Sequence, residues 1–291
     1  MPDLSSRYSR CIKRGLALLL TGLALDASAQ DIASIDWTLA ETLSALGAPP
    51  TAVAQVGDYH SWVGKPHLPE GISDLGLRTQ PNLEQLAQHP PERILISPMF
   101  ASLAPRLERV APVETLALYT PDDDTWTRML ALTRDLGGLV GRPQAAETLI
   151  ASTATRLEEL RNRLPRDPSP LLVVQFMDER HVRVFGGNGL FQVAMDRLGL
   201  ENAWKETTNY WGFSLVGVEA LLEQEARLVV IEPYPIGVEE TLANSALWQH
   251  HPSVREGSVI TLPPVWSFGA LPSLRRFAEL LVDALAEAPE T

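Results

Sequence analysis

Short apolar runs alternate with longer amphipathic segments after residue 30, and this alternation predicts the secondary structure. Short continuous apolar runs are typical of strands that are buried on both faces of a sheet. Strands that alternate with helices favour an α/β fold with mostly parallel sheets and right-handed crossovers. The predicted strands are Ile32–Ile35, Ala52–Val56, Arg93–Ser97, Leu171–Phe176, Val182–Phe185, Leu228–Glu232 and Val259–Leu262. The predicted helices are Thr38–Leu46, Asn82–Gln88, Thr125–Val140, Gly189–Leu198, Val218–Gln224 and Ser273–Ala286.

A longer helix is predicted in the middle of the chain, from Pro143 to Leu164. Proline suits the first turn of a helix, and Pro165 ends the helical pattern. A helix of about twenty residues is about 30 Å long and can join two small domains. We therefore expect an N-terminal α/β lobe at residues 30–142, a linking helix at 143–165 and a C-terminal α/β lobe at 166–291. The alternative is a helix that packs within one domain.

The first 29 residues have the composition of a cleaved signal peptide. A basic start is followed by the eleven-residue apolar run Gly15–Leu25, and Ala27-Ser28-Ala29 gives a small-x-small cleavage pattern. The apolar run is too short to span a bilayer as a helix, so we expect export without insertion into the membrane.

Composition narrows the functional classes further. The 291 residues carry a formal net charge of −12, which argues against sequence-independent binding to nucleic acid or to anionic lipid. The one cysteine, Cys11, lies in the predicted signal peptide, so the exported chain has no disulfide. We expect a monomer.

Aromatic residues follow many of the predicted strands, among them Trp62, Phe100, Trp266 and Phe268. Ligands of open α/β sheets bind beyond the carboxyl ends of the strands, so these positions favour an aromatic cleft between two lobes. For any single aromatic residue, packing in the core is the alternative. Arg78, on a turn before a predicted helix, offers a planar fork of donors for paired oxygens, and a surface salt bridge is its alternative.

Complete catalytic or metal-binding motifs are not found. Gly212-Phe213-Ser214 resembles the start of a nucleophile elbow, but Val216 stands where the second glycine is required. The six histidines form no HExxH motif, and a protein-ligated metal site is not supported. A periplasmic hydrolase that uses Ser214 with His181 or His60 stays open, because a triad can assemble in space.

Four segments carry a resemblance to a known family: GLRTQPNLEQL (76–86), RHVRVFGGNGLFQ (180–192), ENAWKETTNYWG (201–212) and PPVWSFGA (263–270). With them, the chain from about Ile32 to Ala286 resembles the periplasmic ferric hydroxamate siderophore-binding proteins. The resemblance implies a class III periplasmic binding protein, with two α/β lobes joined by one rigid helix. It also implies delivery of a ferric siderophore to an inner-membrane ABC importer, without catalysis and without a cofactor.

Site residues also follow from the resemblance. It implies that Arg78 donates hydrogen bonds to the iron-coordinating hydroxamate oxygens, and that aromatic side chains wall the pocket. The aromatic residues at the matching positions are Trp62, Trp211, Trp266 and Phe268.

Three positions depart from the family pattern. Phe100 replaces a tyrosine that supplies a polar contact, and Ile96 replaces a pocket tryptophan. Arg183 stands where the family has an apolar side chain, and a cleft-facing Arg183 would favour a more anionic chelate.

The resemblance further implies docking on the importer through one acidic residue on each lobe. Glu219 falls near the expected place in the second lobe. In the first lobe Pro105 occupies the expected position and Glu108 is a neighbour. A solvated helix face is the alternative for both glutamates.

The sequence thus predicts a periplasmic solute-binding protein for ferric siderophores, most of all hydroxamates. Another bulky chelate, such as haem, cobalamin or a carboxylate siderophore, is the alternative within this class. A hydrolase or an adaptor that binds protein in its cleft are the alternatives from other classes.

Overall fold

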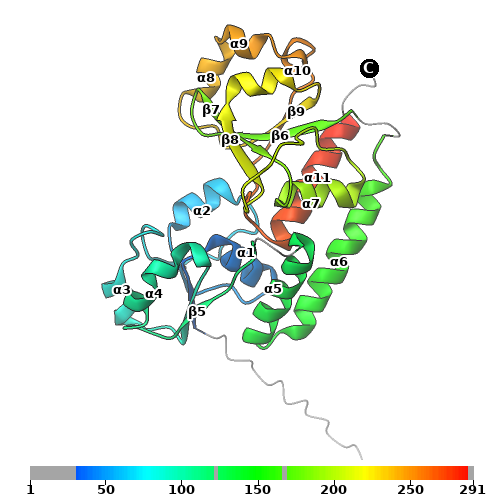
Figure 1. Ribbon diagram of the computed structural model, residues 1–291. Helices are drawn as coiled ribbons and strands as arrows, with labels where there is room; N and C mark the ends of the chain where they lie inside the picture. The colour runs from blue at the N-terminus through cyan, green and yellow to red at the C-terminus, as the bar shows by residue number, and fades with distance from the viewer. Residues whose placement is uncertain (1–30, 121–123, 166–168, 288–291) are drawn as a thin grey trace, which may run out of the picture.

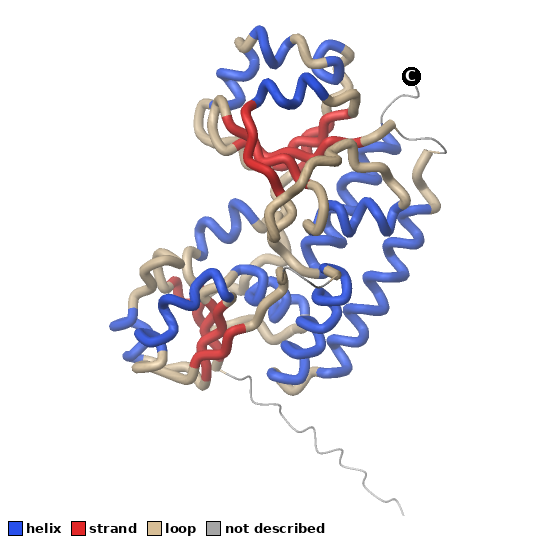
Figure 2. The backbone as a smooth tube through the Cα atoms, in the orientation of Figure 1, coloured by secondary structure: helices blue, strands red, loops and turns tan. Residues whose placement is uncertain are grey.

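The computed structural model describes residues 31–120, 124–165 and 169–287, and the predicted signal peptide lies outside them. These residues form two α/β lobes, each with a five-stranded sheet, joined by one long helix (Figures 1 and 2). Within the described residues, no helix has the length and apolar character needed to cross a bilayer. The two α/β lobes and the long helix that joins them confirm the predicted fold class.

The N-terminal lobe is built on a fully parallel sheet in the order β3-β2-β1-β4-β5. Its strands are short, and Val56, predicted as the end of a strand, instead begins a helix. Strand β3 and strand β5 were not predicted, because two or three residues are too few to establish a pattern. The elements are β1 (Ile32–Ser34), α1 (Trp37–Ala45), β2 (Ala52–Val53), α2 (Val56–Trp62), β3 (Ser73–Asp74), α3 (Leu83–Gln88), β4 (Arg93–Ile96), the 3₁₀ helix η1 (Pro98–Leu103), α4 (Ala104–Leu107), β5 (Val113–Thr115) and α5 (Thr125–Leu139).

The C-terminal lobe has a mixed sheet in the order β10-β9-β6-β7-β8. Strands β10, β9 and β6 are parallel, whereas β7 is antiparallel to both of its neighbours. For β6 and β7 the reason is the tight turn that joins them, which leaves no room for a crossover helix. The predicted helix at 218–224 is a 3₁₀ helix. The elements are β6 (Leu171–Phe176), β7 (His181–Phe185), α7 (Leu190–Leu198), β8 (Phe213–Gly217), η2 (Val218–Glu223), β9 (Arg227–Ile231), α8 (Val238–Ala243), α9 (Ala246–Gln249), α10 (Pro252–Arg255), β10 (Ile260–Leu262) and α11 (Leu271–Glu287).

The linking helix α6 spans Pro143–Arg161, four residues shorter than the range 143–165 predicted for it. The backbone N–H of Asn162 donates to Glu158 O and Leu160 O and closes the last turn. The residue before a proline disfavours helical geometry, which explains why α6 stops ahead of Pro165. Close packing holds its start against α5, since a Cβ atom at Gly137 would lie 2.6 Å from that of Ala146.

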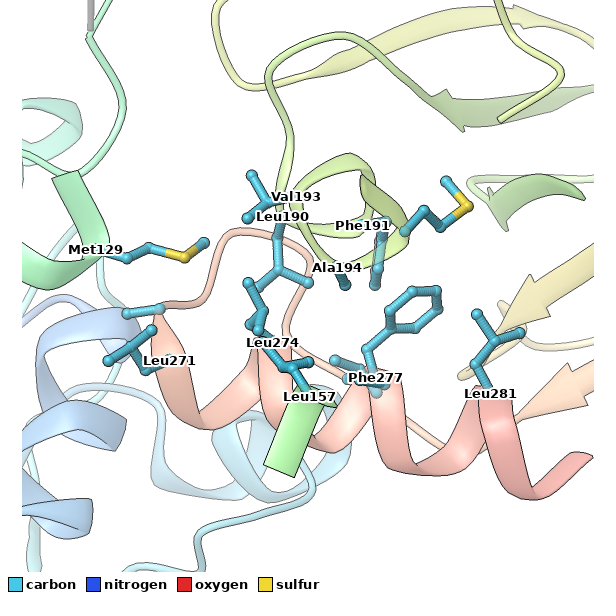
Figure 3. Close-up of a cluster of buried hydrophobic side chains, with 14 of the residues drawn as sticks. Met129, Leu157, Leu190, Phe191, Val193, Ala194, Leu271, Leu274, Phe277 and Leu281 are labelled. Atoms are coloured by element: carbon cyan, nitrogen blue, oxygen red, sulfur yellow. The ribbon is translucent and has the colours of Figure 1, made fainter. Parts of the chain in front are cut away.

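One continuous apolar cluster runs from the linking helix into both lobes. In Figure 3, Leu157 of α6 lies close to Leu274 and Phe277 of α11, with α7 above them. The rings of Phe191 and Phe277 have centroids 4.6 Å apart. Shared burial of this kind resists hinge motion, because opening the lobes would expose apolar surface.

A buried carboxyl group also ties the lobes together. Glu41 of α1 accepts hydrogen bonds from the backbone N–H of Ala270 (2.7 Å) and from the hydroxyl of Ser273, at the start of α11. Glu41 is fully buried, and this burial raises its pKa to about 8. An N-terminal lobe residue therefore caps the last helix of the C-terminal lobe.

Candidate functional site

A cavity of about 480 Å³ lies between the two lobes, and residues of both line it. Its N-terminal wall comes from loops that follow strands β1 to β4, at the carboxyl ends of the parallel sheet. This is where open α/β sheets place their ligands. The volume lies within the range of small-molecule sites, about 300–1,000 Å³.

Arg78 projects from the loop after β3 and stacks on an aromatic ring. Its guanidinium carbon lies 3.7 Å from the ring centroid of Trp37 and 5.4 Å from that of Trp266. Burial lowers the pKa of Arg78, while Asp36 and Asp58 act in the opposite direction. Its Nε is buried and has no hydrogen-bond partner among the described residues. The Arg78 side chain lines the cavity, and its charged N–H groups can donate hydrogen bonds to an electron-rich oxygen.

Gln55 holds the Arg78 loop in place. Its side-chain Oε1 accepts from the backbone N–H of Arg78 (3.1 Å), and its own N–H donates to Gly76 O (2.7 Å). Its Nε2 donates to Asp58. Gln55 has a left-handed backbone (φ 55°, ψ 55°), which is costly for a residue other than glycine. The contacts with Arg78 and Gly76 connect the β2 and β3 loops, and the contact with Asp58 holds Gln55 against the start of α2.

A tryptophan from the C-terminal lobe reaches into the N-terminal one. The indole N–H of Trp266 donates to the Thr38 hydroxyl (3.0 Å), which in turn donates to Phe268 O (2.9 Å). The rings of Trp266 and Trp37 meet edge to face at 5.0 Å. Trp266 is mostly buried, so it fixes the two walls to each other as well as lining the cavity.

The C-terminal wall combines aromatic rings with one cation. Trp211 and Phe213 come from the end of the loop before β8 and from β8 itself, and Phe268 follows β10. Arg183 of β7 also lines the cavity, so its side chain faces the ligand site. Its guanidinium carbon lies 5.0 Å from the ring of Phe213 and 5.4 Å from that of Phe268.

Six of the seven predicted ligand residues meet at this cavity: Arg78, Arg183, Trp62, Trp211, Trp266 and Phe268. Phe100 was predicted at the site but does not line the cavity. The 3₁₀ turn η1 directs its ring into the core of the N-terminal lobe with Ile96, and its neighbour Met99 lines the cavity instead. The centroid of the Phe100 ring lies 5.8 Å from the Arg78 guanidinium carbon, so Phe100 is near Arg78 without lining the cavity.

Some lining residues were missed by sequence reasoning: Asp36, Trp37, Thr38, Gln55, Asp58, Met99, Met177 and Phe213. Of these, Trp37 carried a signal, as an aromatic residue two positions after the predicted strand Ile32–Ile35. Asp36 is also the N-cap of α1, and its carboxylate accepts from the backbone N–H groups of Thr38 and Leu39. Such a cap cannot be distinguished from a binding residue in sequence.

The residues named for other roles lie elsewhere. Glu219 and Glu108 are exposed, the first at the start of η2 and the second at the end of α4. The Ser214 hydroxyl donates to Thr207 O, and the His181 ring pairs with Asp178. The Ser214 hydroxyl and the His181 ring are therefore each engaged in a local structural contact. Across residues 31–120, 124–165 and 169–287, no group of three His, Cys, Asp or Glu side chains could hold a metal ion.

A family model described as "Periplasmic binding protein" matches residues 32–265. The chain belongs to the periplasmic binding protein family. It is 33% identical over 256 residues to the iron(3+)-hydroxamate-binding protein FhuD of Escherichia coli, covering 87% of this chain and 86% of that protein.

Solved structures of this family have the same fold. The siderophore-binding protein FhuD of Vibrio cholerae with bound Fe³⁺–Desferal matches with a TM-score of 0.85 and 27% identity, over 90% of this chain and all of that one. The triscatecholate siderophore-binding protein FeuA of Bacillus subtilis matches with a TM-score of 0.72 and 17% identity, over 88% and 92%. The second likeness shows that one fold serves more than one kind of chelate, so ligand class depends on the side chains of the cavity.

Proposed function

We propose that this protein binds ferric siderophores of the hydroxamate type in the interlobe cavity and delivers them to an ABC importer. The observation that carries the proposal is the Arg78 guanidinium, which stacks on Trp37 and lines a cavity walled by aromatic rings. The names of the E. coli and V. cholerae relatives support the same ligand class.

The chemistry of the cavity suits a pre-formed chelate. Hydroxamate oxygens that coordinate iron are electron-rich, and charged donors make their strongest hydrogen bonds to such acceptors. The organic shell of the chelate is apolar in part and packs on the faces of Trp62, Trp211 and Phe268. The siderophore saturates its own iron, so the protein recognises the complex and supplies no metal ligand.

Titration with a ferric trihydroxamate is expected to quench tryptophan fluorescence. Four of the seven tryptophans line the cavity, namely Trp37, Trp62, Trp211 and Trp266, and an iron chelate in contact with their rings quenches emission. The measurement is a fluorescence titration with ferrioxamine B, ferrichrome, haem and cobalamin.

Two variants locate the signal. Trp62→Phe is expected to reduce the amplitude of quenching, whereas Trp126→Phe, which removes a ring packed under Arg197 outside the cavity, is expected to leave the amplitude unchanged. Quenching by haem or cobalamin but by neither ferric hydroxamate would assign the site to another chelate. No response to any of the four compounds would refute the proposal.

Delivery is proposed to use Glu219 on the C-terminal lobe, with Glu108 as the corresponding acidic residue on the other lobe. Both are exposed and both lie outside the ligand cavity, as a docking contact requires. We also propose that residues 1–29 direct export to the periplasm and are removed there.

Glu219→Arg is expected to lower importer-dependent uptake of the chelate roughly tenfold or more, because like charges at an interface cost several kcal/mol. The measurement is uptake of radiolabelled ferric hydroxamate by cells that carry the importer. Glu223→Arg, an exposed charge reversal at the other end of η2, is the matched control. Equal uptake by Glu219→Arg and by the unaltered protein would remove Glu219 from the docking surface.

A further inference from the structure

Arg183 lies on the part of the second sheet that lines the cavity. It lies opposite Gln175 of β6 and Leu215 of β8, so the three side chains share one face of the sheet. Farther along the same face, Val173 and Phe185 are buried in the cluster with α7 and α11. Arg183 lies between Phe185 and the exposed end of β7, and its side chain lines the cavity.

The charges of the two cavity walls are not alike. Arg78 has two carboxylates near it, Asp36 and Asp58, which favour its charged form. Arg183 is largely buried between Phe213 and Phe268, and burial alone lowers its pKa. Among residues 31–120, 124–165 and 169–287, no carboxylate forms an ion pair with Arg183.

A partly buried arginine without an ion pair gains more binding free energy from an anion than an exposed arginine does. Partial burial removes water from the guanidinium, and the flanking rings supply only their weak attraction for a cation. A carboxylate matches the guanidinium fork with two parallel hydrogen bonds and neutralises the charge. On the N-terminal wall, the carboxylates of Asp36 and Asp58 already lie near Arg78 and compensate its positive charge.

We propose that Arg183 binds a carboxylate on the organic backbone of the chelate, and that the site therefore prefers ferric hydroxamates with a pendant anionic group. The inference rests on the proposed function, since it assigns the iron-coordinating oxygens to Arg78 on the opposite wall. Arg183 is then the residue that selects among hydroxamate chelates by their peripheral charge.

Three chelates with one iron centre test this selection: ferrioxamine B with its terminal ammonium, its N-acetyl derivative and its N-succinyl derivative. Dissociation constants are measured by tryptophan quenching. The unaltered protein is expected to bind the succinyl chelate about tenfold or more tightly than the acetyl chelate, as for a hydrogen bond to a charged group. The ammonium chelate is expected to bind more weakly than the acetyl chelate, since like charges repel.

The decisive quantity is the ratio of the acetyl and succinyl dissociation constants within each variant. Arg183→Leu is expected to bring this ratio close to one, and Arg183→Lys is expected to retain part of it, because lysine keeps the charge but not the fork. Arg180→Leu is the matched control, since Arg180 is exposed three residues away and outside the cavity, and it is expected to keep the full ratio.

The outcomes separate this inference from the proposed function. If the unaltered protein binds the acetyl and succinyl chelates equally well, the role of Arg183 is refuted while hydroxamate binding stands. The same holds if Arg183→Leu weakens both chelates by one factor, which would place Arg183 on the iron-bound oxygens. If none of the three chelates binds, both proposals fail.

Discussion

Glu41→Ala is expected to lower the free energy of unfolding by about 2–4 kcal/mol, measured by urea denaturation. The substitution leaves the Ala270 N–H and the Ser273 hydroxyl buried without their acceptor, and each unsatisfied group costs about 1–3 kcal/mol. It also removes the carboxyl cap from the first turn of α11, the helix that packs against α1, α5, α6 and α7. A decrease of less than about 0.5 kcal/mol in the free energy of unfolding would mean that water replaces the carboxyl group at no cost.

The protonation of Glu41 gives this prediction a dependence on pH. Burial raises its pKa from 4.5 to about 8 in the folded protein, and the nearby Asp36 acts in the same direction. The folded state then holds a proton that the unfolded state has lost between these two values. The stability contributed by Glu41 is therefore full below pH 4.5, falls as the pH rises and is lost above about pH 8, by at most about 1.4 kcal/mol per pH unit.

Glu41→Gln is the matched control for the pH dependence. The amide keeps an acceptor for Ala270 and a donor for the Ser273 hydroxyl, but it does not titrate. We expect the unaltered protein to lose stability relative to Glu41→Gln between pH 5 and pH 8.5. A constant difference across this range would show that Glu41 is ionised throughout, with its carboxylate stabilised by the helix N-terminus.

Arg78→Ala is expected to weaken binding of a ferric trihydroxamate by about 1.5–3 kcal/mol, which is roughly a 10- to 150-fold rise in Kd. The physical reason is the loss of a charged hydrogen-bond donor that lines the cavity. The Trp37 ring would also lose the cation stacked on it and become more exposed to the cavity. Fluorescence titration or calorimetry gives the two dissociation constants.

Two comparisons separate ligand binding from folding and from net charge. Arg78→Lys keeps the charge without the planar fork, and we expect it to recover only part of the affinity. Arg106→Ala removes an exposed positive charge from α4 of the same lobe and is expected to leave the Kd unchanged. An Arg78→Ala protein that binds as tightly as the unaltered one would make Arg78 a structural residue.

The helices and strands were largely predictable, because the faces that they bury produce a regular spacing of apolar residues along the sequence. The strand at Leu171–Phe176 and the α6 start at Pro143 were both predicted at the residues where the structure has them. Prediction failed where an element has only two or three residues, as in β3, and it missed β8, whose start lies in a segment rich in aromatic and glycine residues. In each case the hydrogen bonds of neighbouring strands, not local sequence, make the strand.

The candidate site was predicted less evenly than the fold. Trp62 and Phe268 follow the rule that ligand residues lie in loops after strands, whereas Trp211 was assigned from the family resemblance, and the structure brings all three to one cavity. Phe100 follows the same rule and was misplaced, because a 3₁₀ turn rotates its ring into the core. Trp37 was not assigned to the site, although its ring supports the Arg78 guanidinium.

The α/β class, the long middle helix, the family resemblance and six of the fourteen residues that line the cavity could be read from the sequence. These features depend on the local periodicity of burial and on motifs within short segments. The tertiary structure alone decided that Arg183 faces the cavity, that Trp266 is tied to Thr38 and that Glu41 caps α11. The contacts of Trp266 and Glu41 join residues more than two hundred positions apart, and they form only when the shared core fixes one lobe against the other.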